Sequence, residues 1–174
     1  DLNASTLSGY GGINLVANNV IGGRGVLTQT GGSLDALMAG ANITIRSGGN
    51  ATLTGPIHAG GGIDIQAGMN GVAMPSGYGG NLSIGGNLTA DAGMGVSLLA
   101  KGGSVAQGDL TQTAGTIYGS TVMVNGLRNV VLNGNLTAGT GMLNVTAGDT
   151  MMAGYGGDLT VGNGALQGYG GVTL

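Results

Sequence analysis

The chain of 174 residues contains no cysteine, phenylalanine, tryptophan or glutamate. The absence of cysteine excludes disulfide bonds and thiol chemistry, and the hydrophobic core must be built from aliphatic residues and methionine, with five tyrosines as the only aromatics. Only 6% of the residues are charged and the formal net charge is -3, so we expect no nucleic-acid partner. No apolar run approaches the roughly 18 residues of a membrane-spanning helix, and we expect no membrane insertion.

Glycine, in contrast, is abundant, with 42 residues, against a usual share of about 7%. It does not recur at every third position, which excludes a collagen helix, and 41% of the residues are apolar, which argues against a disordered linker. In the stretch Ala41–Gly68, apolar and polar residues alternate over short segments that SGG, AGGG and AG turns separate. The composition therefore predicts many short β-strands joined by tight turns.

Similar phrases return along the chain in a fixed order. LTQT at Leu27 recurs at Leu110, so that a long repeat of about 80 residues covers the sequence. Within this repeat, apolar positions such as Ile43 and Ile63 recur at a spacing of about 20 residues. We therefore predict an all-β protein, a parallel β-helix (β-solenoid) with about 20 residues per coil and about eight or nine coils.

Two stretches, Gly134–Gly154 and Gly79–Val105, alternate GNLTA with LNVTAGD-like phrases and resemble the repeats of the filamentous haemagglutinin-like exoproteins of bacterial two-partner secretion. The resemblance implies a right-handed β-helix in an exported protein of the bacterial surface that serves adhesion or biofilm formation. The residues Gly171–Leu174 look like the first strand of a further unit. We expect residues 1–174 to be a single β-solenoid segment of a longer repeat protein.

Seven Asn-x-Ser/Thr sequons allow two interpretations. They are sites of N-glycosylation, as in some adhesins of the family that the chain resembles, or they arise because a strand that begins with asparagine at a corner reads Asn-apolar-Thr. In the second case, asparagines of successive coils would form a hydrogen-bonded ladder along the rod. The sequons start at Asn3, Asn42, Asn50, Asn81, Asn87, Asn135 and Asn144.

Tyrosines in YGG motifs are the candidate surface contacts. If the long repeat superposes, Tyr10, Tyr78 and Tyr155 occupy equivalent corners. Exposed there, they would contact host or surface glycans or neighbouring rods, because tyrosine combines apolar area with a hydrogen-bonding hydroxyl. The alternative is that each ring packs over the glycines of its own motif.

Catalytic and cofactor signatures are missing from the sequence. GxSxG, P-loop and GxGxxG motifs do not occur, and the single histidine, His58, has no cysteine with which to form a catalytic pair. The seven aspartates lack the spacing of calcium-binding nonapeptide repeats. We therefore predict a non-catalytic chain without cofactor or metal. Methionines near strands are expected to fill gaps in the core, namely Met38, Met69, Met94, Met123 and Met142.

Thr-x-Thr pairs would line one outward face if the coils align. Rows of threonine occur on β-solenoids that bind ice, but Arg46, Gln66 and Ser83 are expected to interrupt the rows here. The preferred interpretation is therefore the ordinary preference of threonine for strands. The pairs are Thr28 with Thr30, Thr52 with Thr54, and Thr111 with Thr113.

Together these patterns predict the structural shaft of a secreted bacterial adhesin, located outside the cell or on its surface. Its partners would be neighbouring coils of the same long chain and host or surface glycans. A second hypothesis is an extracellular filament subunit that stacks end to end with further copies of itself through the open edges of the β-helix.

Overall fold

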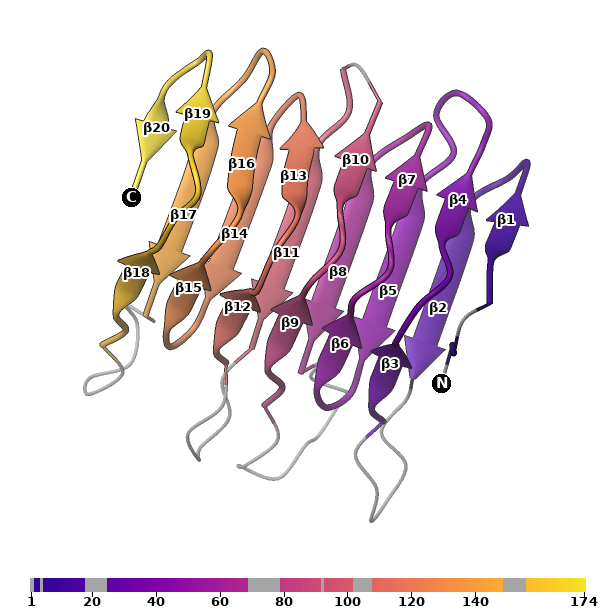
Figure 1. Cartoon of the computed structure of the whole chain (residues 1–174), viewed down its shortest axis with the longest axis horizontal. Coiled ribbons are helices and arrows are strands. Elements are labelled where there is room, and N and C mark those ends of the chain that lie inside the picture. Colours follow the sequence, from indigo (N-terminus) through magenta and orange to yellow (C-terminus); the bar gives the residue numbers. More distant parts are fainter. Residues whose placement is uncertain are drawn as a thin grey trace.

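The computed structural model describes residues 2–3, 5–17, 25–68, 79–91, 93–101, 108–148 and 156–174. Their strands form three parallel sheets, here called A, B and C (Figure 1). Sheet A contains β3 (Leu27–Gln29), β6 (Ala51–Leu53), β9 (Leu82–Ile84), β12 (Leu110–Gln112), β15 (Val130–Leu132) and β18 (Leu159–Val161). Sheet B contains β1 (Leu7–Gly9), β4 (Leu34–Ala36), β7 (Ile57–Ala59), β10 (Leu88–Ala90), β13 (Thr116–Gly119), β16 (Asn135–Ala138) and β19 (Leu166–Gly168). Sheet C contains β2 (Ile13–Ala17), β5 (Ile43–Ser47), β8 (Ile63–Ala67), β11 (Val96–Ala100), β14 (Val122–Gly126), β17 (Leu143–Ala147) and β20 (Val172–Thr173).

The chain passes through the sheets in the order A, B, C, and every strand pairs with the equivalent strand of the next coil. In Figure 1 it runs up the nearer strands of A and B, returns down the more distant strands of C, and advances from right to left. This combination of turn and advance is right-handed. The predicted right-handed parallel β-solenoid is therefore confirmed. Among the described residues there is no helix that is long and apolar enough to cross a membrane.

The length of a coil varies along the stack. Ile43 pairs with Ile63, and Val122 pairs with Leu143, so these two coils have the predicted length of about 20 residues. Ile63 pairs with Val96, and this coil is much longer because longer connections enter it. As a result, sheets B and C each hold seven strands in the described residues, where eight or nine coils were expected.

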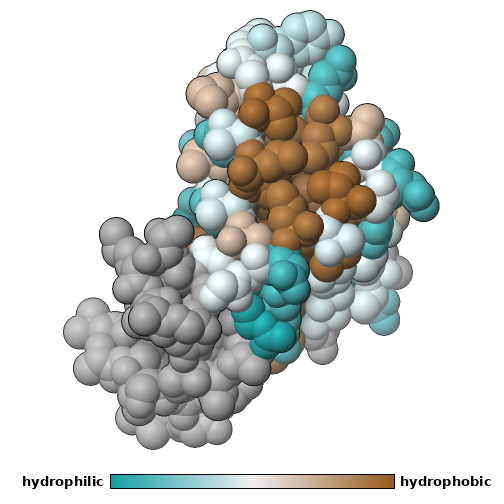
Figure 2. Space-filling model, turned by 90° about the vertical axis from the view of Figure 1, so that its left-hand side faces the viewer, coloured by the Kyte–Doolittle hydropathy of each residue, from teal (hydrophilic) through white to brown (hydrophobic). Residues whose placement is uncertain are grey.

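The interior of the solenoid reaches the surface at the end formed by β18, β19 and β20. Val161 and Val172 of the last coil are 40% and 44% exposed, and Leu174 is 65% exposed. Figure 2 looks onto this end and shows a continuous hydrophobic area with hydrophilic residues around it. A further coil stacked on this end would bury the area.

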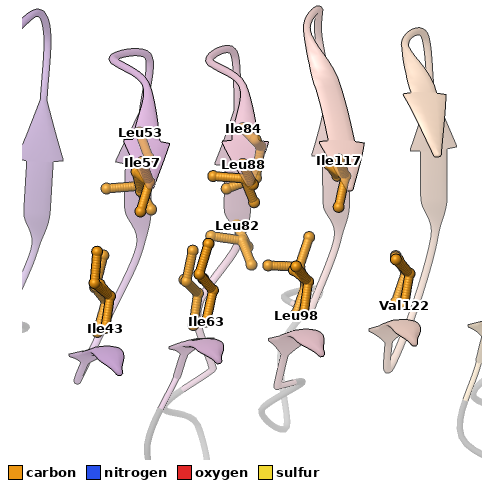
Figure 3. Close-up of a cluster of buried hydrophobic side chains, with 14 of the residues drawn as sticks. Ile43, Leu53, Ile57, Ile63, Leu82, Ile84, Leu88, Leu98, Ile117 and Val122 are labelled. Carbon is orange, nitrogen blue, oxygen red and sulfur yellow. The ribbon is translucent and has the colours of Figure 1, made fainter. Parts of the chain in front are cut away.

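The core is a column of aliphatic side chains from alternate positions of every strand. The three-residue strands of A and B away from the two ends of the stack bury their first and third residues, as in β6 and β7. The four-residue strands β13 and β16 bury their second and fourth, and most strands of C bury their first, third and fifth. In Figure 3, Ile63 and Leu98 from sheet C face Leu82 from sheet A and Leu88 from sheet B. Each such side chain contributes about 1.5–3 kcal/mol by leaving water. Because the register is regular, each coil buries its core residues on those of its neighbours.

The prediction that methionines fill the core is wrong for the described residues. Met38, Met94, Met123 and Met142 are all exposed at the surface. Met123, for example, is the second residue of β14 and so points away from the core, because side chains alternate along a strand. Met69 lies outside the described residues.

Candidate functional site: corners and faces of the coil stack

The corner between sheets A and B carries a glycine packed closely on the preceding coil in each of six successive coils. A methyl group added to Gly86 would lie 2.1 Å from the carbonyl oxygen of Gly55, and one added to Gly134 would lie 2.1 Å from that of Gly115. Backbone therefore packs directly on backbone, and no side chain fits between the coils. These residues, called the glycine column below, are Gly32, Gly55, Gly86, Gly115, Gly134 and Gly164.

Two fully buried glutamines donate hydrogen bonds to the backbone at this corner. Gln29 and Gln112 end the strands of the two LTQT motifs, and their Nε2 atoms donate hydrogen bonds to the carbonyl oxygens of Gly32 (3.5 Å) and Gly115 (3.0 Å). Both glycines adopt positive φ, 62° and 82°, in the turns that follow these strands. The amide of Gln29 supplies a donor to the carbonyl of Gly32, whereas the carbonyl of Gly115 also accepts the backbone N–H of Asn135 (3.2 Å). Neither Oε1 atom has a hydrogen-bond partner among the described residues.

A ladder of polar side chains runs along the corner between sheets C and A. From β6 to β18, the residue before each strand of sheet A is asparagine or aspartate, and its Oδ1 accepts the backbone N–H of the equivalent residue in the next coil. We call this series the Asn/Asp ladder. Its steps are Asn50 to Asn81 (3.0 Å), Asn81 to Asp109 (3.1 Å), Asp109 to Asn129 (3.1 Å) and Asn129 to Asp158 (3.1 Å).

The predicted hydrogen-bonded ladder is present, but only its first step joins two asparagines, Asn50 and Asn81, because Asp109 and Asp158 take alternate positions. Asn50 and Asn81 are both sequon asparagines. Asn144 lies instead on the outward face of β17. Glycosylation would modify the Nδ2 atoms, which these bonds do not use, and it stays a prediction. Three bridges of the same kind lie at other corners: Asn42 to Gly62 (2.7 Å), Asn87 to Thr116 (2.9 Å) and Asn135 to Ala165 (2.9 Å).

The YGG motifs precede strands of two different sheets. Tyr10 is 78% exposed between β1 and β2, so its ring does not pack over the neighbouring glycines. Tyr78 and Tyr155 lie outside the described residues, but the strands that follow them, β9 and β18, belong to sheet A, whereas β2 belongs to sheet C. The expected equivalence of Tyr10 with the other two is therefore wrong. Tyr169, which precedes β20 of sheet C and is 73% exposed, corresponds to Tyr10. Sequence reasoning missed it, although its QGYGG motif was the available signal.

Charged side chains pair between neighbouring coils. The guanidinium of Arg46 contacts the carboxylate of Asp64 on sheet C. Arg128 Nε lies 3.3 Å from Asp109 Oδ1, and His58 Nε2 lies 2.9 Å from an oxygen of a carboxylate in the next coil, that of Asp91. Exposed pairs of this kind contribute only about 0–1 kcal/mol each. Within the described part of the chain, no three histidine or acidic side chains come together as metal ligands.

Sheet A presents two outward rows of short side chains. The row of middle residues pairs in register from strand to strand, and the second row lies two residues further along each strand. Of the residues expected to interrupt these rows, Arg46 and Gln66 lie on sheet C, and only Ser83 lies on sheet A, because the three sheets face different directions. The first row is Thr28, Thr52, Ser83, Thr111, Val131 and Thr160; the second is Thr30, Thr54, Gly85, Thr113, Asn133 and Gly162.

Sheet C carries a shallow open depression over its corner with sheet B. Thr44, Asp64, Ser97 and the glycines at 62 and 95 are among the residues that line it. It is too open to enclose a small molecule.

Searches of family models, of curated proteins and of solved structures return no match to this chain.

Proposed function

We propose that the chain is the non-catalytic structural shaft of a secreted bacterial surface adhesin of the filamentous haemagglutinin-like kind, which supports adhesion or biofilm formation outside the cell. The observation that carries the proposal is the Asn/Asp ladder, which runs parallel to the backbone hydrogen bonds of the three sheets. From β6 to β18, each coil is thus bonded to the next by both main chain and side chain along the axis of the rod. A stack bonded in this way resists bending even though its hydrophobic core is narrow.

The surface residues on the sides of the rod are also consistent with a non-catalytic shaft. Asp64 and Asp109 already have cationic partners on the surface, so they do not converge on a reaction centre. Tyr10 and Tyr169 project at the B–C corner and offer contact area to glycans or to a neighbouring rod. A shaft needs this combination of internal bonding and sparse, exposed contact residues.

Negative-stain microscopy and limited proteolysis of the purified chain test the shaft. We expect short rods of uniform width that resist protease at concentrations that digest a globular control. Irregular or globular particles with rapid digestion would contradict the proposal.

Binding to immobilised bacterial or host glycans tests the contact residues. Tyr10→Ala and Tyr169→Ala should reduce this binding, while Tyr118→Ala on the face of sheet B serves as the control.

A second candidate, an extracellular filament subunit that stacks end to end, is favoured by the apolar end at β18–β20 (Figure 2). A second copy whose first coil continues the three sheets would bury this area and pair the strand edges. Long fibres that lengthen with protein concentration are expected. Val161→Lys should abolish them by placing a charge on the stacking surface, while Thr160→Lys, on the outward side of the same strand, should not. Discrete rods at every concentration would exclude the filament and leave the shaft.

A further inference from the structure

We propose that the outward face of sheet A binds ice, a function separate from that of the shaft. The face consists of the two rows of threonine and other short side chains described above. In the first row, Thr28 lies directly beside Thr52, which lies beside Ser83, and Thr111 lies beside Ser83 on the far side. The hydroxyls therefore form an ordered array over four successive strands.

The spacing of this array is set by the sheet. Neighbouring strands lie about 4.7–4.9 Å apart, and residues two positions apart in a strand are separated by roughly 6.6 Å. A Thr-x-Thr pair repeated on stacked strands therefore gives a near-rectangular grid. These two repeats are close to those of water oxygens on a prism face of hexagonal ice, so the grid can hold water in an ice-like arrangement.

Hydrogen bonds within the protein fix the second row in place. The hydroxyl of Thr54 donates to the carbonyl oxygen of Gln29 (2.9 Å), and that of Thr113 donates to the carbonyl oxygen of Ile84 (3.2 Å). Their hydrogens are used internally, so each oxygen faces solvent as an acceptor at a defined position. Because these side chains are already ordered, binding to a lattice loses little side-chain entropy.

The other two faces lack these properties. Sheet B carries His58 and Tyr118 in its outward row, and sheet C carries Arg46 and Met123, so both faces are uneven and hold charged or bulky groups. The two rows of sheet A contain neither a charged nor an aromatic side chain. This composition also disfavours a carbohydrate as the ligand of this face, because a sugar ring would find no aromatic surface on which to stack.

Three of the six strands depart from the Thr-x-Thr pattern in the second row, where Gly85, Asn133 and Gly162 replace threonine. In the first row, Val131 has a methyl group in place of the hydroxyl of threonine. We therefore expect the face to bind ice through the regular strands β3, β6 and β12, with modest activity for a chain of this length.

The test is partition of the purified chain into slowly grown ice, together with thermal hysteresis and the shape of single ice crystals. We expect the chain to enter the ice and to produce faceted crystals. Thr52→Tyr and Thr111→Tyr should abolish both effects, because a ring lifts the flat face off the lattice. Thr89→Tyr and Thr137→Tyr make the same change on sheet B and should leave them intact. Circular dichroism and thermal melting confirm that each variant is folded, and Thr52→Val, which removes one hydroxyl with little change of shape, should give a partial loss.

Exclusion of the intact chain from ice, as for an ordinary protein, would overturn the proposal. Equal losses from the sheet A and sheet B variants would overturn it as well, because the effect would then not belong to one face. Either outcome leaves the shaft untouched, since microscopy and proteolysis test the shaft independently.

Discussion

The connections before and after each strand of sheet A differ in how much their length and residue types vary. Where the chain leaves for sheet B, the connection is short in every coil and contains a member of the glycine column. Where the chain arrives from sheet C, the connection holds three residues between Ser47 and Ala51 but fourteen between Ala67 and Leu82. The A–B connections hold only two to four residues and always include a glycine of the column, whereas the C–A connections vary more than fourfold in length.

The difference has a physical cause. At the A–B corner, the carbonyl of one coil occupies the space that a side chain of the next would need, so no Cβ atom fits at the positions of the glycine column. At the C–A corner, the register is restored after the connection by the Asn/Asp ladder, whose residues directly precede each strand. Asn81 follows a long connection and Asn129 a short one, and both make the same bond to the next coil. Because this side-chain bond sets the register of the next strand, the length of the C–A connection before it can vary.

The largest effect should come from filling the glycine column. Gly86→Ala places a methyl group 2.1 Å from the carbonyl oxygen of Gly55, and because only backbone can move, we expect a loss of about 3 kcal/mol in the free energy of unfolding. Gly11→Ala is the matched control, since a methyl group there meets nothing within 4 Å. Urea denaturation followed by circular dichroism measures both. Equal stability of the two variants would show that the column is not tightly packed.

A smaller loss is expected from Gln112→Ala at the same corner. The change removes the side-chain donor to the carbonyl oxygen of Gly115, which keeps the backbone N–H of Asn135, and it leaves a cavity in the core; together these effects cost about 2 kcal/mol. Gln112→Leu fills the cavity and removes an unpaired Oε1 atom, so it should be less destabilising than the alanine variant. Gln66→Ala, on the outward face of β8, should be nearly neutral. If Gln66→Ala destabilised as much as Gln112→Ala, burial of the amide would not be the cause.

The fold was predictable because alternation and repeat length report directly on strands and their stacking. Ile43 and Ile63, which lie one coil apart in the sequence, are paired neighbours in sheet C. The face of a residue was harder to assign: Met123 was expected in the core because it lies near a strand, although its second position in β14 turns it outward. A motif also does not identify a corner, since YGG precedes strands of sheet A as well as of sheet C.

Contacts between coils were the least predictable part of the candidate site. The sequence indicated that asparagines would stack, but it did not show that Asp109 takes part in the same ladder, because only the register places it between Asn81 and Asn129. The row on sheet A was misjudged for the same reason. Arg46 interrupts the threonines in the sequence, yet the coil carries it to another face. Such assignments depend on the lengths of the connections, which no local pattern specifies.

The Asn/Asp ladder should contribute less per residue than the glycine column. Asn81 Oδ1 accepts from the backbone N–H groups of Gly108 (3.0 Å) and Asp109 (3.1 Å), so Asn81→Ala removes both bonds at a partly exposed site and should cost about 1.5 kcal/mol. Asn81→Asp keeps the acceptor and should restore most of this stability. Asn144→Ala, outside the ladder, should cost much less. Equal losses for the alanine and aspartate variants would mean that the acceptor is not what stabilises this corner.

The smallest effect should come from lengthening the C–A connection. Four glycine and serine residues inserted between Ala67 and Leu82 should cost less than about 0.5 kcal/mol, because the entropy of loop closure grows only slowly with length and Asn81 still sets the register after the insertion. The same four residues inserted between Ile84 and Leu88 would separate Gly86 from the glycine column and should cost at least as much as Gly86→Ala. Similar losses for the two insertions would remove the distinction between the corners. A small loss at the C–A corner that becomes large when combined with Asn81→Ala would show that the ladder is what allows coil length to vary.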